Sequence, residues 1–224
     1  MSMMGYVLRL PPNAITKLRA DTTLTQGVTS AAVQEASDRQ YADAIAQMTP
    51  DQRDRAGTRR AKMTEERSKF LLGHPELSRQ IAADKDARDR ALRTLGALPR
   101  VLELQKSWHV LHYLFTGHGY AAETPSDALL SGEPIGDDVG YGPARLQTPA
   151  LTREFNEFLT KQELEALISR LNFPEMTRLG IYPVFGADET SDAWQEEVRY
   201  YFPLLRDYVH QTRVEDDGLL IWLS

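Results

Sequence analysis

Residues 131–148 bring together side chains that could hold a small molecule. Asp137 and Asp138 supply carboxylates, Tyr141 supplies a phenol, and Arg145 supplies a planar guanidinium suited to a carboxylate or a phosphate. Glycine-rich turns of this kind also expose backbone amides, which can help to bind an anion. The stretch is therefore a candidate site for a small anionic ligand.

The same residues also have a structural interpretation. Neighbouring side chains on extended backbone point to opposite sides, so Asp137 and Asp138 are poorly placed to flank one bond in two-carboxylate catalysis. Turn chemistry, in which aspartate accepts backbone amide hydrogen bonds, is the interpretation that we favour for both. Arg145 fits an external anion and an internal ion pair with Asp137, Asp138 or Glu133 equally well.

A second group with potential chemistry is formed by His109 and His112, which are one helical turn apart beside Trp108. Three-residue spacing permits two imidazoles to share a metal ion. On a helical wheel, however, His112 lies at the edge of the apolar stripe that contains Trp108 and Leu111, whereas His109 points away from it. We therefore expect structural roles for the histidines and no metal site, and keep His112 and Trp108 as candidates for lining a ligand site.

Other reactive patterns are missing from the sequence. The chain has no cysteine, which excludes disulfides, thiolate catalysis and cysteine-ligated zinc. It also has no phosphate-binding loop, dinucleotide fingerprint or nucleophile elbow. We expect no cofactor, and the sequence leans away from an enzyme.

The formal charge of −6 is unevenly distributed. Residues 51–93 carry 12 basic and 8 acidic side chains, whereas residues 101–224, here called the acidic body, carry 9 basic and 20 acidic ones, a net charge of −11. A surface of that sign repels phosphate backbones, so we expect no nucleic-acid binding. The mixed charges of residues 51–93 are typical of solvated helix faces.

The candidate residues must be positioned by a small set of helices and strands. Gly5–Leu10 and residues 219–223 predict two strands paired with each other, and residues 13–20 predict a short helix. Residues 28–98 are helix-forming but poor in apolar side chains, with a helix start at Thr49 and a break at residues 73–75. We expect two or three helices in this block.

Further helices are predicted after residue 98. The stripe Val101, Leu104, Trp108, Leu111 and Phe115 predicts one helix from Pro99 to Gly117. Short helices are expected after Thr124–Pro125 and Thr148–Pro149, and a capping box is expected at residues 160–163. The last long helix contains Pro203, where we expect a kink, and residues 180–184 form either a short strand or an extended connection.

These elements predict an α+β fold, with a small mixed or antiparallel sheet packed with several helices and a helical insertion. We divide the chain into a compact domain of residues 1–27 and 99–224 and a charged helical insertion of residues 28–98. No apolar segment is long enough to cross a membrane and no signal peptide is evident, so we expect a soluble, cytoplasmic protein.

Five segments, taken in order, resemble the YfbM-like family, a bacterial domain of unknown function. They are MMGYVLRL, WHVLHYLFTG, SGEPIGDDVGYGPARLQTP, IYP and the terminal GLLIWLS. The resemblance implies a compact α+β domain and brings no established activity. The helical block of residues 28–98 departs from the usual pattern of that family.

We expect a non-catalytic interaction domain that binds a protein partner or a second copy of itself, for example in an immunity-type or scaffold role. The acidic body would suit a basic partner. The alternative is a small-molecule or anion-binding domain, or an enzyme, with its site at residues 131–148.

Overall fold

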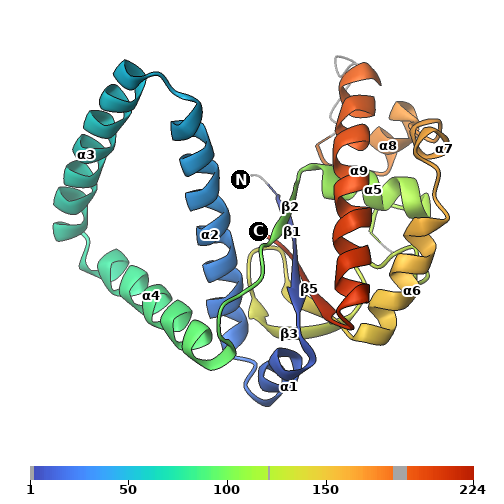
Figure 1. Cartoon of the computed structure of the whole chain (residues 1–224), viewed down its shortest axis with the longest axis horizontal. Helices are drawn as coiled ribbons and strands as arrows, with labels where there is room; N and C mark the ends of the chain where they lie inside the picture. Colours follow the sequence, from blue (N-terminus) through green and yellow to red (C-terminus); the bar gives the residue numbers. More distant parts are fainter. Residues whose placement is uncertain (1–2, 121, 184–190) are drawn as a thin grey trace.

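A five-stranded antiparallel sheet forms the centre of the molecule (Figure 1). The computed structural model describes residues 3–120, 122–183 and 191–224. The strands are β1 (Gly5–Leu10), β2 (Leu102–Gln105), β3 (Glu133–Asp138), β4 (Pro143–Gln147) and β5 (Gly218–Leu223), in the order β2-β1-β5-β4-β3. Helices cover both faces, which confirms the predicted α+β fold.

The predicted pairing of the first and last strands is confirmed. β1 and β5 pair antiparallel over their whole length, from Gly5 opposite Leu223 to Leu10 opposite Gly218. Both strands lie inside the sheet and are mostly apolar, with Arg9 of β1 as the exception, because each face of the sheet is covered by helices. Val7 joins the core on one face, and Leu8 joins the core on the other.

The first face of the sheet carries the C-terminal helices. They are α5 (Ser107–Thr116), α6 (Pro149–Thr160), α7 (Leu164–Ile168), α8 (Phe173–Arg178) and α9 (Ser191–Val214). The core on this face includes Val7, Trp108, Phe155, Phe202 and Ile221. Each of these side chains is nearly or fully buried, so α5, α6 and α9 are fixed to the sheet by apolar packing.

The second face of the sheet carries α1 (Pro12–Ala20) and the first half of α2 (Leu24–Gln47). Val28, Ala32 and Ala36 of α2 are buried with the strand residues Leu8 and Leu220. The helix α4 (Pro75–Leu95) packs on α2 and contributes Ala91 to the same core. Parts of residues 28–98 therefore belong to the core beside the sheet.

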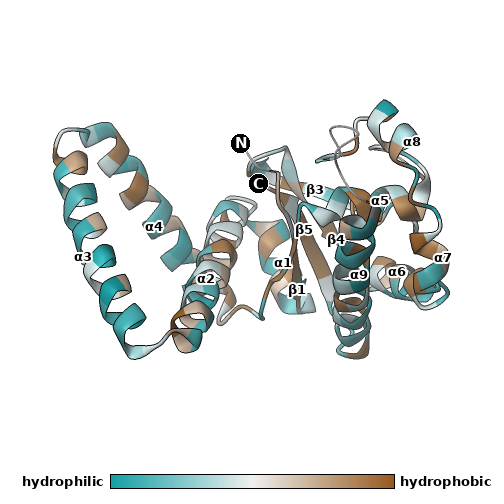
Figure 2. Ribbon diagram, turned by 90° about the horizontal axis from the view of Figure 1, so that it is seen from above, coloured by the Kyte–Doolittle hydropathy of each residue, from teal (hydrophilic) through white to brown (hydrophobic). Residues whose placement is uncertain are grey.

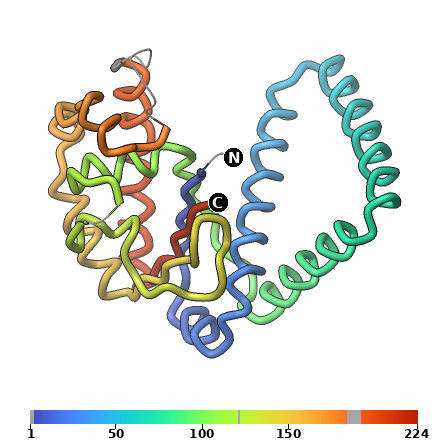
Figure 3. The backbone as a smooth tube through the Cα atoms, turned by 180° about the vertical axis from the view of Figure 1, so that it is seen from behind, coloured from blue at the N-terminus to red at the C-terminus, as the bar shows by residue number. Residues whose placement is uncertain are grey.

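The helix α3 (Pro50–Leu72) has no buried residue. With α2 and α4 it forms an open frame that projects from the rest of the molecule (Figures 1 and 3), and most residues of α3 are hydrophilic (Figure 2). Its start is as predicted, because the Thr49 side chain accepts a hydrogen bond from the Gln52 amide and the Gln52 side chain accepts one from the Thr49 amide. The expectation of two or three helices is met by α2, α3 and α4.

The predicted helix from Pro99 to Gly117 is wrong in its first half. Residues 102–105 form β2, which pairs with β1, and α5 begins only at Ser107. Val101 and Leu104 are both buried, but they join the cores on opposite faces of the sheet, which residues on one helical stripe would not do. Gln105, at a φ of 50°, turns the chain from strand to helix.

Two further helix starts differ from expectation. Residues after Thr124–Pro125 form only turns, such as the hydrogen bond from the Ala128 amide to the Pro125 carbonyl. Thr160 belongs to α6, where its hydroxyl donates to the Asn156 carbonyl and is not free to cap, so α7 begins after Glu163. The start at Thr148–Pro149 is confirmed.

The remaining expectations concern the region around α9. Pro203 lies inside α9, as expected, and the kink stays a prediction. Residues 180–182 form a turn and connection, and Val184 lies outside the described residues. None of the helices in the described part of the chain is both long and apolar enough to cross a lipid bilayer.

Candidate functional site

Residues 131–148 form a β-hairpin, although the sequence indicated only glycine-rich turns there. β3 and β4 pair from Glu133 opposite Leu146 to Asp138 opposite Pro143, with an irregularity between Ile135 and Asp138. Gly136 and Gly140 have positive φ angles, and a Cβ at either would lie within 3 Å of Thr25 or of Leu223 and Ser224. The glycines therefore allow the hairpin to pack closely on α2 and on β5.

The two aspartates of the hairpin have different surroundings. The Asp138 carboxylate accepts hydrogen bonds from the amides of Gly140 at 2.7 Å and Gly142 at 3.1 Å, which is turn chemistry. Asp137 is exposed and forms no hydrogen bond or ion pair with any described residue. Asp138 therefore has the turn role that the sequence favoured, and no such contact of Asp137 is found among the described residues.

Arg145 lies in a pocket of about 500 Å³ on the first face of the sheet. It is opposite Ile221 in the register of β4 and β5. Arg145 forms no ion pair or hydrogen bond with another residue in the described ranges. The suggested internal partners are used elsewhere or exposed, since Glu133 pairs with Arg19 at 2.7 Å and Asp138 binds glycine amides.

Tyr141 and Tyr120 give the pocket two phenolic side chains. Tyr141 is 42% exposed and Tyr120 is 59% exposed, so both are accessible to solvent. The rest of the lining is mostly apolar and includes Met3, Leu129, Leu130, Pro143, Ile221, Trp222 and Leu223. The pocket thus brings together two predicted site residues, Arg145 and Tyr141.

A nearby acidic group was missed by sequence reasoning. Asp127 has one carboxylate oxygen that is buried without a hydrogen-bond partner among the described residues. Burial raises the pKa of Asp127, whereas the charge of Arg145 acts in the opposite direction. Only a fold that returns residue 127 towards β4 reveals this relationship, because 17 positions separate Asp127 from its neighbouring cation in the sequence.

The structure places His112 and Trp108 away from Arg145, inside the core. Both are nearly or fully buried and belong to α5. Neither ring nitrogen of His112 has a hydrogen-bond partner among the described residues, and burial lowers its pKa to about 4. His112 is therefore a neutral, buried side chain near pH 7.

The expectation that His109 points away from the core is wrong. The side chain is fully buried and stacks on Trp108, with 4.4 Å between ring centroids. Its Nε2 donates to the Gly119 carbonyl at 2.5 Å and its Nδ1 accepts from the Tyr182 amide at 2.9 Å. The loops that contain residues 119 and 182 cover the face of α5 that a helical wheel treats as solvent. His109 thus has a structural role.

Metal binding has no support in the described ranges. No group of three or more histidine, aspartate or glutamate side chains there is placed to hold an ion. Both ring nitrogens of His109 are already used in hydrogen bonds to the backbone.

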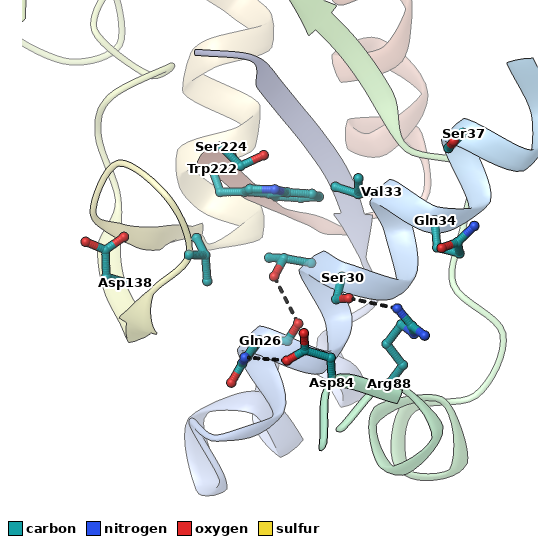
Figure 4. Close-up of a pocket in the computed structure, with 12 residues that line it drawn as sticks. Gln26, Ser30, Val33, Gln34, Ser37, Asp84, Arg88, Asp138, Trp222 and Ser224 are labelled. Atoms are coloured by element: carbon teal, nitrogen blue, oxygen red, sulfur yellow. Dashed lines mark hydrogen bonds between the residues drawn. The ribbon is translucent and has the colours of Figure 1, made fainter. Parts of the chain in front are cut away.

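A second pocket, of about 460 Å³, lies between α2, α4, the hairpin and the end of β5 (Figure 4). Its polar side chains are already connected to each other: Gln26 donates to Asp84 at 3.3 Å, and Arg88 donates to Ser30 at 3.4 Å. Gln26, Ser30, Gln34 and Ser37 recur every three or four residues on α2. The sequence analysis missed this pocket, which this polar stripe on α2 could have indicated. The two hydrogen bonds connect α2 to α4.

The fold and the pockets define an α+β protein with a frame of three helices beside its sheet. A family model described as a domain of unknown function (DUF1877) matches residues 1–222, so the chain belongs to that family. Its fold resembles the crystal structure of a protein of unknown function, YfbM from Escherichia coli, with a TM-score of 0.55 and 14% identity over 99% of each chain. A search of the curated proteins finds no match.

Proposed function

We propose that this protein is a non-catalytic interaction domain that self-associates, with α3 of one copy packing on the acidic body of a second copy. The observation that carries the proposal is that α3 is 23 residues long and has no buried residue. Most of the stability of protein helices comes from tertiary packing. A long helix without such packing is best explained by a surface that a partner covers.

The side chains of α3 suit a protein contact. Met63, Phe70 and Leu72 are 62%, 52% and 85% exposed. Ala56, Met63 and Phe70 follow each other at intervals of seven residues, with Arg60 and Arg67 between them on the same face. This stripe combines apolar groups with guanidinium groups, the composition that protein interfaces favour.

The charges of the chain favour a second copy as the occupant. α3 carries seven basic and four acidic side chains, a net charge of +3, whereas the acidic body has a net charge of −11. Within one copy, α3 stands away from that body (Figure 1). Opposite charges on two parts that do not meet within a chain favour their meeting between chains.

Sedimentation velocity over a concentration series tests the proposal. Wild-type protein is expected to form dimers or larger assemblies that weaken with salt. The double variant Arg59→Glu/Arg67→Glu changes one exposed arginine of this stripe and one beside it, neither of which has an ion pair among the described residues, and should weaken association at least about tenfold.

The matched control is Lys161→Glu/Arg213→Glu, which makes the same change in net charge on the acidic body. It should associate at least as well as wild type. A wild-type chain that stays monomeric at high concentration, or equal association by both double variants, would overturn the proposal. Binding of only a different, acidic protein to α3 would also count against self-association.

A further inference from the structure

Arg145 is a cationic side chain on a rigid part of the fold. It belongs to β4, which is paired on both sides, with β3 and with β5. Its side chain is partly buried, and no carboxylate in the described part of the chain lies within 4 Å of it. A positioned and partly desolvated guanidinium that no described carboxylate contacts is well suited to bind an anion from outside.

The walls of the pocket limit the rest of the ligand. Most of its lining is apolar, with Leu129 and Leu130 from one loop and Ile221 and Leu223 from β5. Its volume of about 500 Å³ lies within the range of small-molecule sites. The phenolic side chains of Tyr120 and Tyr141 add polar groups to the lining, which also includes Trp222. The ligand must therefore pair an anionic head with an apolar body.

The charges around the pocket favour a carboxylate over a phosphate as the anionic group of the ligand. Among the described residues of the lining, Arg145 is the one cationic side chain, and the nearby Asp127 adds negative potential. A phosphate monoester carries nearly two negative charges near neutral pH and is usually bound by several cationic or amide donors. A carboxylate carries a single charge and matches the planar fork of one arginine.

We infer that the pocket around Arg145 binds a monoanionic carboxylate with an apolar body, with the carboxylate on the Arg145 guanidinium and the body against Leu129, Leu130, Ile221 and Leu223. Tyr141 donates a further hydrogen bond to the carboxylate. The carboxylate belongs either to a free acid or to the C-terminus of a peptide with an apolar last residue, since both present the same chemistry to the pocket.

Titrations monitored by nuclear magnetic resonance test this inference on the full chain. The probes are 3-phenylpropanoate, 3-phenylpropanamide, inorganic phosphate, and an acetylated tripeptide ending in phenylalanine with a free or an amidated C-terminus. The free acid should shift resonances of β4 and β5, and its amide should bind at least about tenfold more weakly. Tighter binding of the free-ended peptide than of phenylpropanoate would identify a peptide as the source of the carboxylate.

Three variants locate the carboxylate. Arg145→Gln should weaken phenylpropanoate binding about 10- to 100-fold and leave amide binding unchanged. Arg145→Lys keeps the charge but loses the planar guanidinium, so its affinity for phenylpropanoate should lie between those of wild type and Arg145→Gln. Tyr141→Phe should reduce this affinity severalfold. Lys161→Gln removes a distant positive charge and should bind like wild type.

Three results would overturn the inference. They are no shift with either carboxylate at millimolar concentration, equal affinity of wild type and a folded Arg145→Gln for the acid, and tighter binding of phosphate than of either carboxylate. If Arg145→Gln fails to fold, Arg145→Lys and Tyr141→Phe decide, and unchanged affinity in both counts as refutation.

Discussion

Gly27 of α2 lies directly against the main chain of Ala87 in α4. A Cβ at position 27 would lie 2.7 Å from the Ala87 carbonyl carbon and 2.9 Å from the Ala91 Cβ. This contact joins the base of the helical frame to the core beside the sheet, because Ala91 belongs to that core.

Gly27→Ala is therefore expected to destabilise the protein by about 1–3 kcal/mol, the usual cost of overpacking, despite the better helix propensity of alanine. Chemical denaturation measures the change. The matched control is Gly57→Ala in α3, where a Cβ would meet nothing within 4 Å. That substitution should stabilise α3 locally by up to about 1 kcal/mol. Equal effects of the two substitutions would contradict the close packing of α2 on α4.

The adjacent aspartates of the hairpin should respond differently to substitution. Asp138→Ala removes the acceptor for two glycine amides and should cost about 1–3 kcal/mol. Asp137→Ala removes an exposed side chain and should change stability by less than about 0.5 kcal/mol. Thermal unfolding of the two variants gives the comparison, and equal losses would argue against the turn role of Asp138.

His112 should make the protein sensitive to acid. Its pKa in the folded protein is about 4, compared with 6.5 for an unperturbed histidine. The unfolded chain therefore binds a proton at this residue between about pH 6.5 and pH 4, and the folded chain does not. The contribution of neutral His112 to the free energy of unfolding is fully present above pH 6.5. It is lost as the pH falls to about 4, and the total loss from this residue is about 3 kcal/mol.

His112→Leu tests that assignment by removing the titrating group while keeping the side chain apolar and of similar size. The variant should lose part of the fall in stability between pH 6.5 and pH 4, when unfolding is measured by urea titration at several pH values. Some acid sensitivity should remain, because burial also lowers the pKa of His109. If His112→Leu had the same dependence of stability on pH as wild type, the assignment of His112 as a buried, neutral side chain would be wrong.

The cap of α3 should control the local stability of that helix. Thr49→Ala removes the hydroxyl that accepts from the Gln52 amide, and capping losses amount to about 0.5–2 kcal/mol. Hydrogen exchange of the first turn of α3 should become faster, with little change in the sheet. Thr64→Ala, in the middle of the same helix, is the control and should leave the first turn unchanged.

The elements with strong local signals were predictable from the sequence. The apolar runs at Gly5–Leu10 and at residues 219–223 are strands, and the start signals at Thr49 and Thr148 begin helices. In each case the signal lies within a few residues, so local sequence is sufficient. The α+β fold follows from these elements, and the family resemblance agrees with the match over residues 1–222.

The local sequence pattern gave wrong predictions where a contact with a distant part of the chain determines the structure. Val101 and Leu104 fit a helical stripe, but pairing with β1 makes residues 102–105 a strand. His109 faces solvent on an isolated helix, but distant loops bury it. Both errors have one cause, since periodicity reports the faces of an element and not what covers them.

At the candidate site, the reactive side chains could be named from the sequence: Tyr141 and Arg145, which follow the adjacent Asp137 and Asp138. Their surroundings depend on the tertiary structure. Folding places Arg145 opposite Ile221 on β5, brings Asp127 near it, and gives its near neighbours in the sequence other partners. The guanidinium is left facing an apolar pocket because strand pairing joins residues that are about 75 positions apart.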